Sequence, residues 1–313
     1  MFDKSKKILI TGSSGVLGTA LKEQLLRQGY KNILAPNSSE LNLTNLKSTK
    51  LYIEKNQPEH IYHLASLVYG LKGNLNNQFN AISTNSTINN NLFLAIHNST
   101  VSKVFFAGTV ASYPYPYKSL PLKEDDFLNG EPHKGEYGYA SAKRFALSYL
   151  KLMKEYHNID YCYGIFTNLY GKNDKFDLEN GHVIPSLIEK AFNAVNNGTK
   201  TVEVWGNVKT SRDFMYSDDA ARAAILAMNN FSGLVNISSG KETTISDVIL
   251  AINNSFSGEL NFIFDKNAPI GVSNRSVDNS RLKEAGFFPE VSIDDGISRV
   301  ITWYRENERI IRR

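Results

Sequence analysis

The chain has 313 residues, of which 42% are hydrophobic and 21% charged, and a formal net charge of +4 at pH 7. This length and composition predict a globular protein, built as one bipartite enzyme or as two domains. The weak, evenly spread positive charge argues against a nucleic-acid partner. There is no run of 18 apolar residues, no apolar signal core at the start, and one cysteine, Cys162, which excludes an internal disulfide. We therefore expect a cytoplasmic protein with no membrane partner.

The first predicted strand, residues 7–10, leads directly into a glycine-rich turn followed by an apolar helical face. In this turn Gly12 permits a tight bend, Gly15 lets the backbone approach a phosphate, and Gly18 allows close packing of helix on strand. The start of the helix then directs free N–H groups at the anion. The predicted pyrophosphate-binding residues are Gly12, Ser13, Ser14, Gly15, Val16, Leu17 and Gly18.

The second predicted strand, residues 31–35, bears on the choice between NAD and NADP. NAD enzymes usually place an acidic residue at the end of this strand to bind the ribose 2′-hydroxyl. Here Asn37 and Ser38 are neutral donors that tolerate a 2′-phosphate, although no arginine is present to bind it. Glu40 lies too far along the chain to decide otherwise. We therefore predict NADPH as the cofactor.

Further strands alternate with helical patterns along the chain. Their candidate ranges are residues 60–64, 103–107, 160–166 and 234–237. This alternation predicts an α/β fold with a Rossmann-type, doubly wound parallel sheet. The rhythm weakens after residue 166, which indicates a smaller C-terminal substrate-binding lobe. We expect an NADP-binding domain of residues 1–165 plus about 213–240, and a substrate-binding lobe of about 166–212 plus 241–313.

The predicted chemistry depends on Thr109, Tyr139 and Lys143. Tyrosine and lysine four residues apart on a helix project from the same face, so the ammonium group should favour the phenolate and lower the tyrosine pKa. Such a tyrosine can exchange a proton with a carbonyl or an alcohol. A hydroxyl residue after a strand, here Thr109, can hydrogen-bond the same oxygen. Together with the glycine turn, these residues predict an oxidoreductase of the short-chain dehydrogenase/reductase type.

Several other motifs are more specific than the glycine turn. They are His-Leu-Ala-Ser at 63–66, Gly-Tyr-Ala-Ser-Ala-Lys at 138–143, Thr-Asn-Leu-Tyr-Gly at 167–171, Gly-His-Val-Ile-Pro at 181–185, Val-Trp-Gly at 204–206 and Ser-Arg-Asp-Phe at 211–214. In these motifs the chain resembles the extended short-chain dehydrogenases/reductases. Within them it resembles the GDP-L-fucose synthases, which are GDP-4-keto-6-deoxy-mannose epimerase-reductases. The resemblance covers almost the whole chain.

The resemblance implies a role for each matching position. It places Thr109, Tyr139 and Lys143 in the catalytic triad and makes His182 the acid of epimerisation, near the nicotinamide. Implied cofactor contacts are Leu64, Ala65, Ser66, Tyr139, Lys143, Phe166, Thr167, Asn168, Leu169 and His182. Implied substrate contacts are Thr109, Asn168, Lys190, Trp205, Arg212 and Arg275. No residue is assigned to a metal. The expected substrate is a GDP-linked 4-keto-6-deoxy sugar of a polysaccharide pathway, and the expected assembly is a homodimer.

One position departs from the family. The family segment reads Gly-Ser-Ser-Cys-Ile-Tyr-Pro, and its cysteine is the base that removes protons beside the ketone. Residues 108–114 here read Gly-Thr-Val-Ala-Ser-Tyr-Pro, so Ala111 replaces that cysteine. Alanine has no ionisable group, and Cys162 belongs to another strand, so we predict reduction at carbon 4 without 3,5-epimerisation. Ile270-Gly271 replaces an Asp-Gly of the family, which leaves the sugar, hexose or heptose, open.

Three alternatives stay open. The first is a bifunctional epimerase-reductase of the GDP-L-fucose synthase type, and the second is a nucleotide-sugar 4-epimerase that retains NAD. The third is a non-enzymatic, dinucleotide-sensing regulator, although such a protein would normally lack the proton-transfer tyrosine. A 4,6-dehydratase is disfavoured, because Val110 and Ala111 stand where those enzymes place an Asp-Glu pair.

Overall fold

The computed structural model describes residues 3–205, 207, 210–265 and 272–313, so Gly206 and Ile270-Gly271 lie outside the described residues. Within them the largest sheet has the strand order β2-β1-β3-β4-β5-β9, and every neighbouring pair is parallel. Its strands are β1 (Ile8–Thr11), β2 (Ile33–Leu34), β3 (His60–His63), β4 (Lys103–Thr109), β5 (Asp160–Phe166) and β9 (Gly233–Ile237). The predicted Rossmann-type, doubly wound parallel sheet is confirmed.

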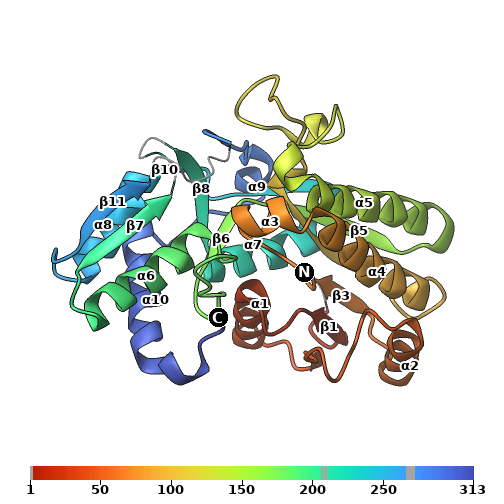
Figure 1. Ribbon diagram of the computed structural model, residues 1–313. Coiled ribbons are helices and arrows are strands. Elements are labelled where there is room, and N and C mark those ends of the chain that lie inside the picture. The colour runs from red at the N-terminus through yellow and green to blue at the C-terminus, as the bar shows by residue number, and fades with distance from the viewer. Residues whose placement is uncertain (1–2, 206, 208–209, 266–271) are drawn as a thin grey trace.

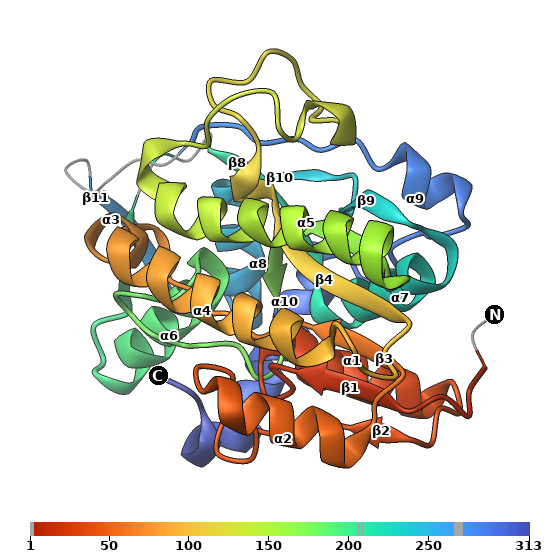
Figure 2. The same cartoon turned by 90° about the vertical axis from the view of Figure 1, so that its right-hand side faces the viewer.

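Successive strand residues point to opposite sides of this sheet, so its buried strands present apolar side chains on both faces. Helices cover each of these faces. Ile8 and Ile10 pack with α1 (Val16–Arg27) and α7 (Ser217–Asn230) in one apolar core. Leu9 packs on the other face, in a core shared by α4 and α5. The helices on that second side are α2 (Leu46–Asn56), α4 (Gln78–Ile96) and α5 (Tyr137–His157), which lie side by side in Figure 2, with the short α3 (Leu71–Asn76) ahead of α4.

A second, smaller part of the chain lies beside the large sheet (Figure 1). Its strands form a β10-β8-β6 sheet and a parallel β11-β7 pair. These elements are β6 (Asn168–Tyr170), α6 (Val183–Asn196), β7 (Thr201–Trp205), β8 (Ser211–Tyr216), β10 (Glu242–Thr244), α8 (Ile245–Ser255), β11 (Asn261–Asp265) and α10 (Ile293–Asn307). They share a third apolar core. The exact division of the chain between the two domains stays a prediction.

The remaining short elements connect these parts. They are α9 (Ser280–Glu284), which contacts β9, and 3₁₀ turns at Val110–Ser112, Glu124–Asp126, Lys134–Glu136 and Glu308–Ile310. The C-terminal segment lies near the start of α1, where Arg312 bonds to the carbonyl oxygen of Ser14. Among the described residues, no helix combines the length and the apolar character needed to cross a membrane.

A buried carboxylate joins the large sheet to the small one. Asp213 of β8 accepts hydrogen bonds from Thr167 Oγ1 (3.0 Å), Ser238 Oγ (2.8 Å), and the backbone N–H groups of Ser239 (3.0 Å) and Gly240 (2.9 Å). Ser239 Oγ donates to it as well, at 2.9 Å. Thr167 follows β5 and the three others follow β9, so one side chain fixes two places where the chain leaves the large sheet.

Candidate active site

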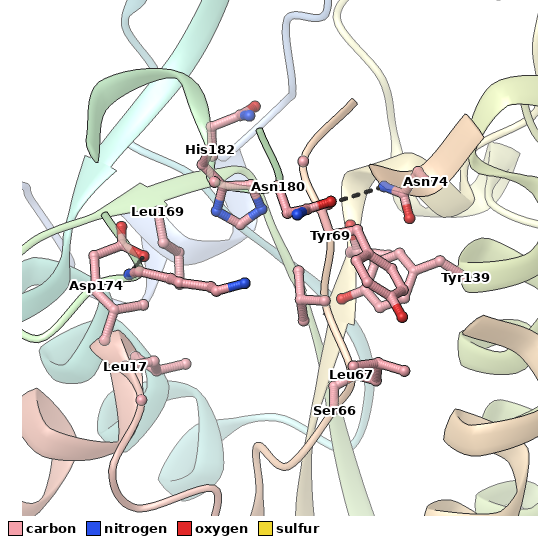
Figure 3. A pocket seen from close by; sticks show the side chains of 18 of the residues that line it. Leu17, Ser66, Leu67, Tyr69, Asn74, Tyr139, Leu169, Asp174, Asn180 and His182 are labelled. Carbon is pink, nitrogen blue, oxygen red and sulfur yellow. Dashed lines mark hydrogen bonds between the residues drawn. The ribbon is translucent and has the colours of Figure 1, made fainter. Parts of the chain in front are cut away.

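One cavity of about 870 Å³ lies at the carboxyl ends of the parallel strands, where they face the smaller sheets. Its walls come from β1, β4, β5 and the segment after β3 on one side and from α6, β7 and β8 on the other. Figure 3 shows part of this lining, with Tyr139 facing His182 and Asp174. The predicted site residues that line it are Gly12, Ser13, Ser14, Gly15, Val16, Leu17, Gly18, Asn37, Ser38, Leu64, Ala65, Ser66, Thr109, Tyr139, Lys143, Phe166, Thr167, Asn168, Leu169, His182, Lys190, Trp205, Arg212 and Arg275. The structure thus brings all of them to one cavity, while their individual roles stay predictions.

The glycine turn has the geometry of a phosphate cradle. Gly12 has a positive φ of +69°, and a Cβ there would lie 2.7 Å from the backbone nitrogen of Ala65. A Cβ on Gly18 would lie only 2.2 Å from the carbonyl oxygen of Gly12, so the turn and the helix pack without room for a side chain. No side chain caps the start of α1, which leaves its first N–H groups free to bind an anion. These residues fit a dinucleotide pyrophosphate.

The end of β2 lies beside this turn. Ser13 Oγ donates to the carbonyl oxygens of Ala35 (3.1 Å) and Pro36 (2.8 Å). The side-chain oxygen of Asn37 accepts from the backbone N–H of residue 39, and the carboxylate of Glu40 accepts from the N–H of Asn37 at 2.8 Å. Glu40 therefore closes the turn and does not line the cavity. No carboxylate stands at the predicted 2′-position.

Thr109, Tyr139 and Lys143 converge from β4 and α5. Thr109 Oγ1 accepts from the backbone N–H of Ala111 at 3.2 Å, which fixes its orientation at the strand end. Lys143 is 2% exposed, and its Nζ donates to the carbonyl oxygen of Ala107 at 2.8 Å. The same Nζ lies 5.6 Å from the centroid of the Tyr139 ring.

The predicted lowering of the Tyr139 pKa is wrong for this structure. Burial raises the pKa of Tyr139 to about 12, against a hydrogen bond with Ser66 that lowers it. Burial also lowers the pKa of Lys143 to about 7, because the ammonium loses hydration and has only a neutral carbonyl in exchange. Desolvation therefore outweighs the attraction between the two groups. The phenol of Tyr139 is protonated at neutral pH and can act as an acid.

His182 is the residue that precedes α6 and lies across the cavity from Tyr139 (Figure 3). Asp174, on the same side, was not predicted as a site residue. It is 6% exposed, and within the part of the chain that the structure describes its Oδ2 has no hydrogen-bond partner. Burial raises the pKa of Asp174, while the charges of His182 and Arg312 lower it. The loop that contains Asp174 carries no motif that would have identified it.

Two predicted substrate residues, Lys190 and Trp205, interact with each other. Lys190 Nζ lies 4.6 Å from the centroid of the Trp205 ring and donates to the carbonyl oxygen of Glu203 at 2.9 Å. The indole N–H of Trp205 donates to Glu203 Oε1 at 2.8 Å. The polar atom of the indole is therefore already bonded, and Trp205 offers the cavity an apolar wall.

Arg275, a predicted substrate contact, is already bonded to other residues of the protein. It is 7% exposed, its Nη2 bonds to Glu136 Oε2 at 2.6 Å, and its Nε donates to the hydroxyl of Tyr117 at 2.6 Å. Although burial acts to raise it, the Arg275 charge holds the pKa of Glu136 below its usual value. Burial, reinforced by the Arg275 charge, lowers the pKa of Arg212 to about 10. Glu136 lies three residues before Tyr139, so Arg275 anchors the start of the catalytic helix.

Position 111 contains no base. Ala111 is buried at the cavity wall, directly after the threonine of the triad. Cys162 is fully buried in the core beneath α1 and α7, and burial raises the pKa of its thiol to about 12. Cys162 therefore does not replace the missing cysteine. Among the described residues, no three His, Cys, Asp or Glu side chains gather in a way that could hold a metal ion.

Comparison with known proteins identifies the family to which the chain is similar. The model of the NAD dependent epimerase/dehydratase family matches residues 8–238. The chain is 32% identical over 311 residues to "Putative GDP-L-fucose synthase 2" of Arabidopsis thaliana, covering 98% of this chain and 94% of the relative. It is also 32% identical over 302 residues to the GDP-L-colitose synthase of Yersinia pseudotuberculosis, covering 95% and 97%.

Solved structures agree in fold over the whole chain. A GDP-L-fucose synthetase from Naegleria fowleri bound to NADP superposes with a TM-score of 0.91 at 27% identity, covering 100% of this chain and 96% of that one. The GDP-mannoheptose C4 reductase from Campylobacter jejuni with NADP bound gives a TM-score of 0.85 at 26% identity, covering 97% and 100%.

Proposed function

This chain belongs to the NAD dependent epimerase/dehydratase family, and we propose that it reduces carbon 4 of a GDP-4-keto-6-deoxy sugar. It is an NADPH-dependent oxidoreductase of the group that contains the GDP-sugar synthases and reductases. The observation that carries the proposal is a cavity in which the triad residues adjoin a phosphate cradle while position 111 has no base. Both hexose and heptose substrates fit this reading.

The chain's own residues supply the proton chemistry of the proposed reaction. NADPH, when bound, supplies the hydride. Tyr139 donates the proton to the ketone oxygen, since its pKa of about 12 keeps the phenol protonated at neutral pH. Thr109 donates a second hydrogen bond to that oxygen, because its Oγ1 accepts from the backbone and its O–H is left to donate. Lys143 places its side-chain nitrogen 5.6 Å from the centroid of the Tyr139 ring.

Loss of epimerisation is the finer part of the proposal. Inversion at carbons 3 and 5 requires a base beside the sugar ring and an acid on the opposite face. His182 supplies a candidate acid, but Ala111 has no proton-accepting group. Glu136 is the carboxylate nearest to Tyr139 along the chain, and its ion pair with Arg275 makes it a weak base.

We expect the enzyme to consume NADPH with GDP-4-keto-6-deoxy sugars and to leave carbons 3 and 5 unexchanged. The test incubates enzyme, NADPH and a panel of GDP- and UDP-linked 4-keto hexoses and heptoses in deuterated water. Nicotinamide absorbance follows reduction, and mass spectrometry of the product follows deuterium. Rapid incorporation at either carbon would establish a bifunctional epimerase-reductase and refute the Ala111 argument. In a parallel incubation with NAD and 4-hydroxy nucleotide sugars, interconversion of the carbon 4 epimers would instead identify a 4-epimerase, and NADPH binding without any turnover would point to a sensor.

The cofactor preference has its own prediction. With no carboxylate at Asn37 or Ser38, NADPH should give a higher catalytic efficiency than NADH. Ser38→Asp should reverse that order, because a carboxylate repels the 2′-phosphate and accepts a bond from a 2′-hydroxyl. Ser38→Asn, similar in size but neutral, is the control and should retain the NADPH preference. A wild-type enzyme that prefers NADH several-fold would contradict this reading of the end of β2.

We further propose a homodimer in the cytoplasm. α4 and α5 pack side by side and present large apolar side chains to solvent, among them Phe79, Phe145 and Tyr156. A second copy of the chain would cover this face in a symmetric interface.

The proposed cytoplasmic location agrees with the state of the single thiol. Cys162 is buried and reduced, which is compatible with a reducing compartment.

A further inference from the structure

The predicted cofactor site has a shortage of positive charge. NADPH carries a pyrophosphate and a 2′-phosphate, yet neither the glycine turn at residues 11–18 nor the segment 35–39 contains a lysine or an arginine. Backbone N–H groups at the start of α1 supply only partial charges. Any full positive charge near these phosphates would therefore come from elsewhere in the chain.

Arg312 brings such a charge to the glycine turn. Its Nη1 donates to the carbonyl oxygens of Ser14 at 3.2 Å and Asn173 at 3.4 Å, and the residue lines the cavity. Both bonds use the same nitrogen, so Nη2 and Nε keep N–H groups that bond to none of the described residues. A guanidinium with two adjacent nitrogens free is suited to bidentate binding of a phosphate.

The segment around Arg312 is held in place on both sides. The carbonyl oxygen of Arg312 accepts from the N–H of Phe176 at 2.7 Å. Arg313 Nε bonds to Oε1 of Glu189 at 2.9 Å, and Glu189 is 4% exposed and also accepts from the hydroxyl of Tyr304 at 2.6 Å. These contacts order the backbone around Arg312 before a ligand arrives. Binding therefore costs little further conformational entropy in this segment.

We propose that Arg312 binds the pyrophosphate of NADPH and completes the cofactor site from the end of the chain opposite to the glycine turn. The pyrophosphate is favoured over the 2′-phosphate because Ser14 immediately precedes the Gly15 that starts the α1 cradle. Asp174 is the carboxylate whose pKa the Arg312 charge lowers, and it opposes an incoming anion. Burial raises the pKa of Asp174, which favours the neutral carboxyl group and so weakens its repulsion of the anion. This inference rests on the proposed use of NADPH.

The test measures dinucleotide affinity directly, by nicotinamide fluorescence on the full chain without substrate. Arg312→Gln should weaken both NADPH and NADH by roughly 10-fold, the lower end for a charge-assisted contact because the side chain is exposed. The difference from wild type should shrink as salt rises. Arg309→Gln removes the same charge three residues earlier and away from the cavity, so its affinities should stay within about twofold of wild type. Arg312→Lys should recover part of the loss.

Each outcome decides between distinct readings. Unchanged affinity in Arg312→Gln would overturn the inference, and a loss confined to NADPH would overturn the pyrophosphate assignment and move the contact to the 2′-phosphate. Equal losses in Arg312→Gln and Arg309→Gln would show an unspecific charge effect and overturn it too. A wild-type chain that binds neither dinucleotide would refute the proposed function itself. Thermal unfolding without dinucleotide serves as the folding check for all three variants.

Discussion

Tyr139→Phe is expected to lower turnover by about 100-fold or more, the effect of losing a general acid. The substitution removes the hydroxyl that donates to the ketone oxygen and leaves the ring packed against Lys143. NADPH affinity should change little, because the phosphate cradle is formed by other segments. The measurements are single-turnover reduction of the best ketosugar and a separate NADPH titration.

Tyr137→Phe is the matched control for this experiment. Tyr137 begins the same helix, is exposed and does not line the cavity, so turnover should stay at the wild-type level. Near-normal turnover in Tyr139→Phe would refute the assigned proton donor. A large loss in both variants would indicate damage to α5 and not the loss of an acid.

The second large effect concerns the buried pair of Glu136 and Arg275. Glu136→Gln leaves the guanidinium of Arg275, which is 7% exposed, without a counter-charge. Breaking one partner of such a pair costs about 3 kcal/mol of unfolding free energy, the lower end because the Glu136 side chain keeps some contact with solvent. Urea unfolding of the cofactor-free protein measures this loss. Activity should fall as well, since the pair anchors the start of the catalytic helix.

A double variant separates charge from packing. Glu136→Gln combined with Arg275→Met removes both charges and should be more stable than Glu136→Gln alone. The exposed pair Lys200–Glu259 is the control, and Glu259→Gln there should have little effect on stability. The single variant Arg275→Met completes the cycle, and a double variant as unstable as the sum of the two single variants would show that the two charges do not depend on each other.

Local patterns were enough to predict the main sheet, the glycine turn and the pairing of Tyr139 with Lys143, whereas the other site residues were inferred from the family resemblance. The strands and the glycine turn are continuous segments with their own periodicity, and Tyr139 and Lys143 share one helical turn. Contacts between distant segments were not accessible in this way. Arg312 is 298 residues from Ser14, and Arg275 is 139 residues from Glu136. The raised pKa of Tyr139 escaped prediction for a related reason, because helical spacing gives the distance to a charge but not the burial that outweighs it.

Asp213 has a consequence for motion. Its carboxylate ties Thr167 and the 238–240 turn, which lie where the chain passes between the two sheets, to a strand that itself leads into α7. A hinge needs backbone dihedrals that can rotate at such crossing points, and here the hydrogen bonds to one buried group oppose that rotation. We therefore expect the two sheets to move as one unit, so that the cavity between them keeps its shape when ligands enter and leave.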